Sequence, residues 1–191
     1  MKKRLLALIL STALVLSFTG CGKEEKKTAL EIQTGATVQE ELVQLVNSDL
    51  PSIADNRDKA VSVYNAYFKD GAELDSETWK KQLQDEALAS YDAYLADLDK
   101  LIYNNSEVVN LKSLFAKSAN SQRDAIDYVI QAIDEVDTAK LDQAQQSIKD
   151  SKTYMSMYED ELKSLCDKYG VTIEGKFQYG TSTDASGTDS E

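Results

Sequence analysis

The sequence contains two thiols, Cys21 and Cys166, and no histidine. A catalytic thiolate needs a neighbouring base or a positive field, and histidine is the most common general base in enzymes. Cys166 also falls in phase with Leu162 and Tyr169 on an apolar helical stripe, and free cysteine packs in protein cores as a small apolar side chain. We therefore expect Cys166 to fill space in a core rather than to act as a nucleophile.

The lack of histidine also removes the Glu-x-x-His pairs that hold two metal ions in some helical bundles. The sequence has no Asp-x-Asp-x-Asx-Gly calcium loop and no glycine-rich phosphate loop. Acidic runs such as residues 159–161 (Glu-Asp-Glu) are typical of a solvated helix face. We therefore expect no metal ion, no cofactor and no enzymatic activity.

Three polar side chains fall within otherwise apolar helical stripes: Ser118 and Gln122 in one predicted helix, and Ser151 in the next. If these two helices are neighbours, the three side chains form one buried polar layer. Such a layer usually fixes the register between helices, because an unpaired buried polar group costs about 1–3 kcal/mol. A binding site for a small polar ligand is the alternative interpretation.

Ten tyrosines are present, and several recur at helical spacing. A tyrosine has a flat apolar body and a polar tip, which suits both a ligand pocket and the packing of a core. Tyr91, Tyr94 and Tyr158 are the candidates to line a site between helices. We expect them to pack in the core, with a tyrosine-lined ligand site as the alternative.

Helical periodicity positions these residues and extends from residue 36 to about residue 170. Thr37 and Glu40 have the spacing of a capping box, which predicts a helix from Thr37 to about Lys69 with a kink near Pro51. Asp75 or Ser76 can cap a second helix, which we expect to end at residues 104–105 (Asn-Asn).

A third helix is predicted after an N-cap at Ser106, and a fourth after Asp137-Thr138, ending at a left-handed cap on Gly170. One continuous rod of ~60 residues would be about 95 Å long and would need a partner along its length. Short connections favour antiparallel neighbours instead. The predicted fold is therefore an all-α, antiparallel four-helix bundle with a kinked first helix.

The pattern changes after Gly170. Apolar and polar residues alternate over residues 171–179, which predicts a short extended segment that lies along the bundle. Residues 180–191 are of low complexity, rich in Ser, Thr, Asp and Gly, and are predicted to be a disordered tail.

The first residues have the composition of an export signal. Residues 2–4 (Lys-Lys-Arg) precede an apolar run over residues 5–18, and Thr19 and Gly20 lie just before Cys21. A helix over this run would be about 21 Å long, shorter than the ~30 Å hydrocarbon core of a bilayer. A permanent membrane span is therefore not expected.

Residues 18–21, Phe-Thr-Gly-Cys, resemble the lipobox of bacterial lipoprotein precursors, although leucine is usual where Phe18 stands. The resemblance covers only about the first twenty-one residues. It implies cleavage before Cys21 and a diacylglyceryl group on its thiol, which would hold the protein on the extracytoplasmic face of the cell membrane. An ordinary signal peptide cleaved elsewhere is the alternative, but Phe18 does not fit the small residue which that cleavage favours.

The mature protein would be strongly acidic. Removing residues 1–20 takes away three positive charges and changes the formal net charge from −12 to −15. Such a surface repels nucleic acid and anionic headgroups, so neither is an expected partner. The predicted organisation is a signal peptide (1–20), a lipid anchor and tether (21–35), a helical domain (36–179) and a tail (180–191).

These patterns predict a membrane-anchored lipoprotein whose acidic helical domain is a noncatalytic interaction module for a protein or cell-envelope partner. The alternative, from a different class, is an extracytoplasmic small-molecule sensor with its site between the helices. Nothing in the residues of the helical domain resembles a known family, so the choice depends on where the candidate side chains lie.

Overall fold

A computed structural model describes residues 36–66 and 75–172, and within these ranges every regular element is a helix. The predicted all-α class is therefore confirmed for the described part of the chain. The predicted signal peptide, anchor and tether (1–35), most of the predicted extended segment (173–179) and the predicted tail (180–191) lie outside the described residues. The predicted end of the first helix near Lys69 also lies outside them.

The first helical stretch consists of α2 (Val38–Gln44), the π-helical turn η2 (Leu45–Asp49), α3 (Leu50–Ser52) and α4 (Ala54–Ala66). The predicted capping box is present: the Thr37 hydroxyl accepts the N–H of Glu40 at 3.2 Å, and the Glu40 carboxylate accepts the N–H of Thr37 at 2.8 Å. A proline ring clashes with the carbonyl four residues before it, and here the turn that precedes Pro51 is widened. The helix then breaks briefly at Ile53.

The second stretch consists of α5 (Ser76–Gln82), the π-helical turn η3 (Leu83–Leu88) and α6 (Ala89–Asp99). Asp75 caps it, because one carboxylate oxygen accepts the N–H groups of Glu77 and Thr78 at 3.0 and 2.9 Å. The stretch ends at Asp99, so the predicted end at residues 104–105 was wrong. Tertiary hydrogen bonds replace helical ones there, since the Lys112 ammonium donates to the Leu101 carbonyl at 2.6 Å.

Two long helices follow, α7 (Ser106–Glu135) and α8 (Thr138–Tyr169). They are separate, as predicted, and the Asp137 carboxylate caps α8 by accepting the N–H of Ala139 at 2.9 Å. The predicted N-cap at Ser106 was wrong, because Asn105 occupies that position and its side chain donates to the Ala36 carbonyl instead. Gly170 ends α8 in the left-handed conformation, as predicted.

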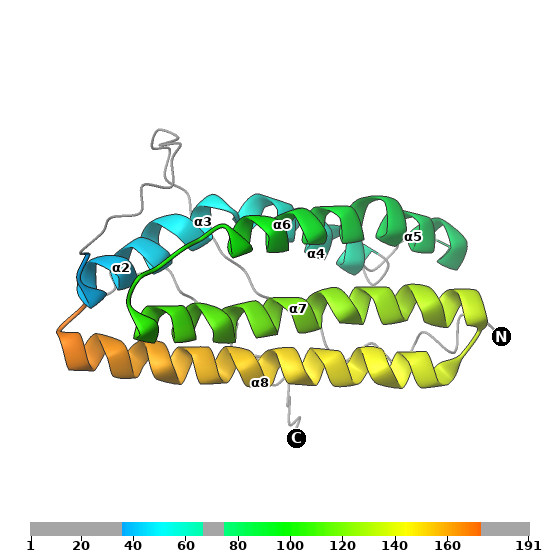
Figure 1. Ribbon diagram of the computed structural model, residues 1–191. Helices are drawn as coiled ribbons and strands as arrows, with labels where there is room; N and C mark the ends of the chain where they lie inside the picture. The colour runs from blue at the N-terminus through cyan, green and yellow to red at the C-terminus, as the bar shows by residue number, and fades with distance from the viewer. Residues whose placement is uncertain (1–35, 67–74, 173–191) are drawn as a thin grey trace, which may run out of the picture.

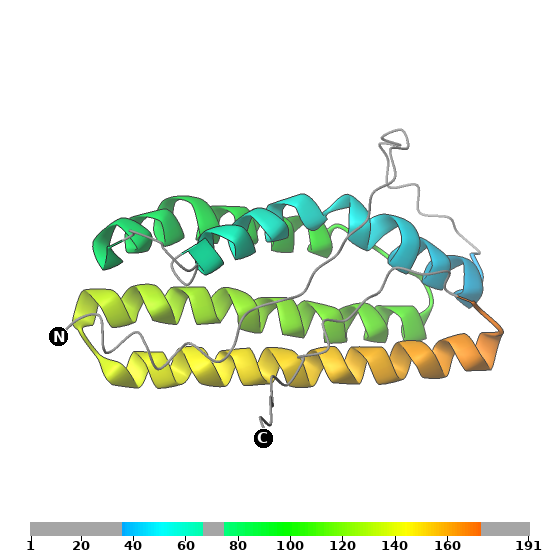
Figure 2. The ribbon, with the colours of Figure 1, turned by 180° about the vertical axis from the view of Figure 1, so that it is seen from behind.

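Helices α7 and α8 run antiparallel and side by side along their whole length, and the earlier helices lie together across one side of this pair (Figure 1). Helices α5 and α6 are nearer the viewer in Figure 1, and α2 to α4 are nearer in the reverse view of Figure 2. The core lies between these layers. The buried apolar residues of α7 and α8 include Leu111, Phe115, Ala119, Ile126, Val129, Leu141, Ala144, Ile148, Met155 and Leu162.

The residue that follows α7 is exposed although it is apolar. Val136 is 62% exposed and adopts the left-handed conformation with φ 53°. This conformation costs a non-glycine residue roughly 1–2 kcal/mol and is a true outlier for a β-branched one. The chain turns from α7 to α8 at this residue, so its side chain points away from the core.

None of the helices in the described ranges is both long and apolar enough to cross a bilayer.

Candidate functional site

Ser118, Gln122 and Ser151 lie together between α7 and α8, as the pattern of polar residues predicted. The Ser118 hydroxyl donates to the Ser151 carbonyl at 2.9 Å and lies 3.0 Å from the Ser151 hydroxyl. The Gln122 amide nitrogen donates to the Ser151 hydroxyl at 2.9 Å. All three residues are buried. Because they pair with one another, their burial leaves these polar groups satisfied.

Tyr91 of α6 joins the same group. Its hydroxyl donates to the Gln122 amide oxygen at 2.6 Å, and the residue is fully buried. Gln122 therefore bonds at its oxygen end to α6 and at its nitrogen end to α8. We call Tyr91, Ser118, Gln122 and Ser151 the polar layer. Its hydrogen bonds connect three helices at one level of the core.

The remaining candidate tyrosines pack against other rings. Tyr94 is buried edge-on against Tyr91, with ring centroids 5.6 Å apart. Tyr158 is buried against Phe115, with centroids 5.2 Å apart. Seven residues of helix, about 10.5 Å, separate Tyr158 from Ser151, so Tyr158 belongs to a different level of the core. The structure thus brings Tyr91 and Tyr94 to the polar layer but not Tyr158.

Burial also determines the acidity of these phenols. It raises the pKa of Tyr64 to about 12, and it raises the pKa values of Tyr91 and Tyr94 well above their ordinary range. The phenols therefore stay protonated at neutral pH, and the hydroxyl of Tyr91 acts as a hydrogen-bond donor. They are poorly suited to exchange protons with a substrate.

Arg57 of α4 is a buried charged residue that the sequence analysis missed. It is 2% exposed, and its guanidinium lies 3.3 Å from the Asp58 carboxylate. Its charge partly offsets the effect of burial on the pKa of Tyr91, which places the guanidinium next to the polar layer. A signal existed, because Arg57 is in helical phase with Ile53, Ala60 and Tyr64.

A second buried charged residue was also missed. Glu41 of α2 is 4% exposed, and its two oxygens accept the backbone N–H groups of Asn104 and Asn105 at 2.8 and 3.0 Å. Burial opposes ionisation, but these hydrogen bonds outweigh it and hold the pKa of Glu41 below its usual range. We call Glu41, Asn104 and Asn105 the Glu41 clasp. It secures the connection between α6 and α7 to the first described helix.

Further contacts join the helices at the same end of the molecule. The Gln39 amide donates to the Tyr169 carbonyl at 2.7 Å, and the Tyr169 hydroxyl donates to the Glu107 carboxylate. The Lys168 ammonium forms an ion pair with Glu107 at 2.6 Å. The start of α2, the start of α7 and the end of α8 are therefore held together.

The structure places Cys166 on the margin of the core, half-buried. Burial and the neighbouring Asp167 raise the pKa of its thiol, which is the opposite of what activates a thiolate. Among residues 36–66 and 75–172, no three acidic, cysteine or histidine side chains gather closely enough to hold a metal ion.

Replacing Gln122 by leucine should destabilise the fold by about 2–3 kcal/mol, because the Tyr91 hydroxyl and the Ser151 hydroxyl each lose a buried partner. Urea denaturation monitored by circular dichroism measures the change. Gln143→Leu, on the exposed side of α8, is the matched control and should change stability by no more than about 0.5 kcal/mol. Adding Tyr91→Phe to Gln122→Leu should cost less than the sum of the single changes. Strict additivity would contradict the Tyr91–Gln122 bond.

Replacing Glu41 by glutamine should cost about 1.5–3 kcal/mol at pH 7, because hydrogen bonds to an ionised group are lost. The folded pKa of Glu41 is depressed, so this stabilisation is present above the pKa of the unfolded chain and disappears as pH falls through the folded value. The stability difference between wild type and Glu41→Gln should therefore shrink below about pH 4. Glu86→Gln, at an exposed site, is the matched control and should change stability at pH 7 by no more than about 0.5 kcal/mol. A difference that stays constant from pH 7 to pH 3 would be inconsistent with an ionised clasp.

The described site is therefore a packed interior whose polar groups bond to one another across helices. The chain matches no known family model, no curated protein and no solved structure.

Proposed function

We propose that this protein is a bacterial lipoprotein, held by lipid on Cys21 at the extracytoplasmic face of the cell membrane. Its helical domain would form an antiparallel four-helix bundle and would act without catalysis, by binding a protein or cell-envelope partner through its surface. The helical stretches separated by π-helical turns would each count as one bent helix of the bundle.

The hydrogen bonds within the polar layer favour a binding role for the surface over a ligand site between the helices. Gln122 uses its amide oxygen for Tyr91 and its amide nitrogen for Ser151, and it is 2% exposed. A ligand at this level would have to displace these bonds and separate packed rings. The layer is better suited to fixing helix register, which leaves the surface for recognition.

The second candidate is a small-molecule sensor with its site between the helices. One observation favours it: the Arg57 guanidinium lies in the same interior as Tyr91, Tyr94 and Gln122. Buried cations are common in sites that bind anionic groups. Opening such a site would require α4 to separate from α6, so ligand binding would be coupled to a movement of helices.

The anchor is tested on the full chain expressed in its bacterial host. Mass spectrometry of the N-terminal peptide should show a chain that begins at Cys21 and carries a diacylglyceryl group on its sulfur. The protein should fractionate with membranes, and Cys21→Ser should release it or leave it unprocessed. An unmodified thiol at residue 21 of the mature protein would overturn the anchor.

The mode of binding is tested by a thermal-shift screen of the mature domain against metabolites and cell-wall fragments. A ligand present at a hundred times its Kd adds about 2.7 kcal/mol, which raises Tm by roughly 5–10 °C for a domain of this size. We expect no such shift. A compound that raises the Tm of wild type and Gln143→Leu but not of Gln122→Leu would establish the sensor instead.

A further inference from the structure

The chain turns back on itself at the end of α8. Gly170 ends the helix in the left-handed conformation, and the Val171 N–H then donates to the Cys166 carbonyl at 2.9 Å. Val171 is half-buried and packs against the core. The chain that follows Thr172 therefore starts from the side of the last turn of α8, beside the core, and not from a continuation of the helix axis.

Helix α2 meets the end of α8 at the same place. The Gln39 amide donates to the Tyr169 carbonyl at 2.7 Å. Val43 lies one turn after Gln39 on the same side of α2, and it is 41% exposed. Cys166 of α8 is only half-buried on the margin of the core. Apolar surface therefore remains partly uncovered where α2 meets the last turns of α8.

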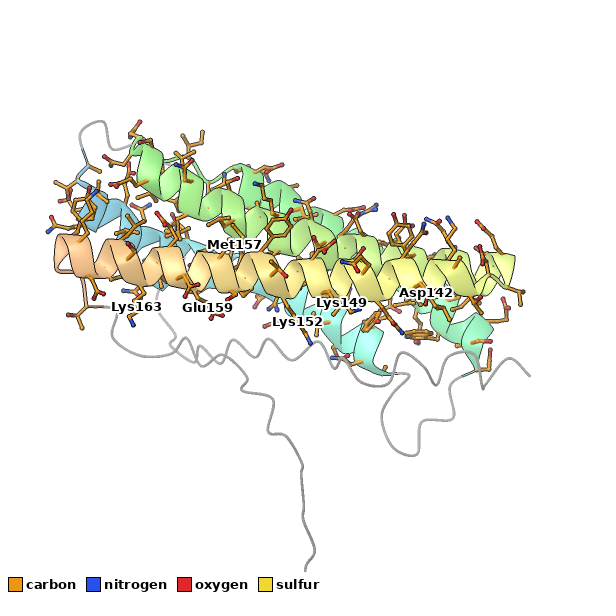
Figure 3. All side chains as sticks on the ribbon, turned by 90° about the horizontal axis from the view of Figure 1, so that it is seen from below. Asp142, Lys149, Lys152, Met157, Glu159 and Lys163 are labelled. Atoms are coloured by element: carbon orange, nitrogen blue, oxygen red, sulfur yellow. The ribbon has the colours of Figure 1, made fainter. Side chains whose placement is uncertain are left out.

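Two charged residues continue this side of α8. Lys163 and Glu159 precede Cys166 at steps of three and four residues, which places all three on one side of the helix. Figure 3 shows Lys163 and Glu159 along one edge of α8, with Met157 on the other. Burial and the neighbouring Asp160 raise the pKa of Glu159, as expected for a carboxylate without a close cation. We call Val43, Glu159, Lys163 and Cys166 the α8 edge.

The residues that follow Thr172 have a pattern that fits this edge. In an extended chain, successive side chains point to opposite sides. Ile173, Phe177 and Tyr179 would then share one side with Val171, whereas Glu174 and Lys176 would share the other. Such a segment would have an apolar side for Val43 and Cys166 and a charged side for the exposed border.

The spacing of the charges also agrees. An extended chain advances about 3.3 Å per residue, so Glu174 and Lys176 would lie about 10 and 17 Å beyond Val171. A helix rises about 1.5 Å per residue, so Lys163 and Glu159 lie about 9 and 15 Å before the end of α8. A course that runs back along α8 therefore brings Glu174 beside Lys163. It also brings Lys176 beside Glu159.

We infer that residues 173–179, the C-terminal strap, dock in extended form along the α8 edge and cover it. Ile173 packs against Val43 and Cys166, and Glu174 and Lys176 each face a residue of opposite charge. The docked strap closes this edge of the bundle to other proteins, so a partner binds elsewhere or displaces it. The inference goes beyond the proposed function and does not depend on the lipid anchor.

The reactivity of Cys166 tests this inference directly. In the full chain with Cys21→Ser, Cys166 is the only thiol. Its reaction with N-ethylmaleimide at constant pH is followed by mass spectrometry. A stop codon after Thr172 removes the strap and should raise the labelling rate roughly fivefold, because access limits the reaction of a covered thiol. A stop codon after Gly180 keeps the strap, and this control should stay within about twofold of the full chain.

Point variants separate the strap from a general effect of truncation. Phe177→Ser removes an apolar side chain from the docked side and should also speed the labelling of Cys166. Gln178→Ser, on the opposite side of an extended chain, is the matched control and should leave the rate unchanged. All variants should keep the helical circular dichroism spectrum of the full chain.

Engineered disulfides test the register in a full chain whose two native cysteines are replaced by serine. Lys163→Cys is combined with Glu174→Cys, and Glu159→Cys with Lys176→Cys. These matched pairs should oxidise roughly tenfold faster than the two crossed pairs, which are about 5 and 8 Å out of register, because a disulfide requires Cα atoms about 4.4–6.8 Å apart.

Three outcomes would overturn the strap. The first is an equal labelling rate for the chains that stop after Thr172 and after Gly180. The second is equal oxidation of matched and crossed pairs, since a segment without a fixed register meets all these positions alike. The third is labelling of the full chain that slows only as protein concentration rises, which would place a second copy on the α8 edge. None of these outcomes affects the test of lipid attachment at Cys21.

Discussion

The side-chain amide of Gln122 bonds at both ends, to Tyr91 on α6 and to Ser151 on α8, and the register of three helices depends on it. An amide has a donor end and an acceptor end, so only one vertical alignment of these helices satisfies both. Sliding α8 by one turn, about 5.4 Å, would leave several polar groups buried without partners, at about 1–3 kcal/mol each. Apolar stripes alone tolerate such shifts more readily, because leucine packs against leucine at many registers. The polar layer therefore gives the core a single arrangement.

The Glu41 clasp likewise satisfies polar groups across helices, at one end of the molecule. The last residues before α7 leave the helix, and their N–H groups need acceptors that a helix would have supplied. The Glu41 carboxylate supplies them and remains ionised because of them. The first turn of α2 consequently holds the connection between α6 and α7. Local departures from helix are stabilised by tertiary contacts, which are invisible in a periodic pattern.

Much of the fold could be predicted from the sequence wherever residues close together in the chain determine the local structure. The Thr37–Glu40 capping box, the Asp75 cap and the Gly170 cap each depend on residues within one turn. The grouping of Ser118, Gln122 and Ser151 required only that α7 and α8 be neighbours. Arg57 was missed because its polar neighbours resemble a solvated face, and its helical phase with Ala60 and Tyr64 was outweighed by its charge. The end of α6 was missed because Lys112 and Glu41, which stabilise it, are distant in sequence.

Recognition and stability would then be assigned to different parts of the molecule. The polar groups of the polar layer are hydrogen-bonded to one another. Replacing them to suit a ligand would therefore remove the bonds that fix the helix register and would also lower the stability of the fold. The turn between α7 and α8 differs from the core, because the backbone strain at Val136 is local and the Val136 side chain contacts solvent. A domain can tolerate about 1–2 kcal/mol of strain at such a turn when the core is well packed. Binding through the surface would therefore leave the polar layer undisturbed, whereas binding between the helices would require its disruption.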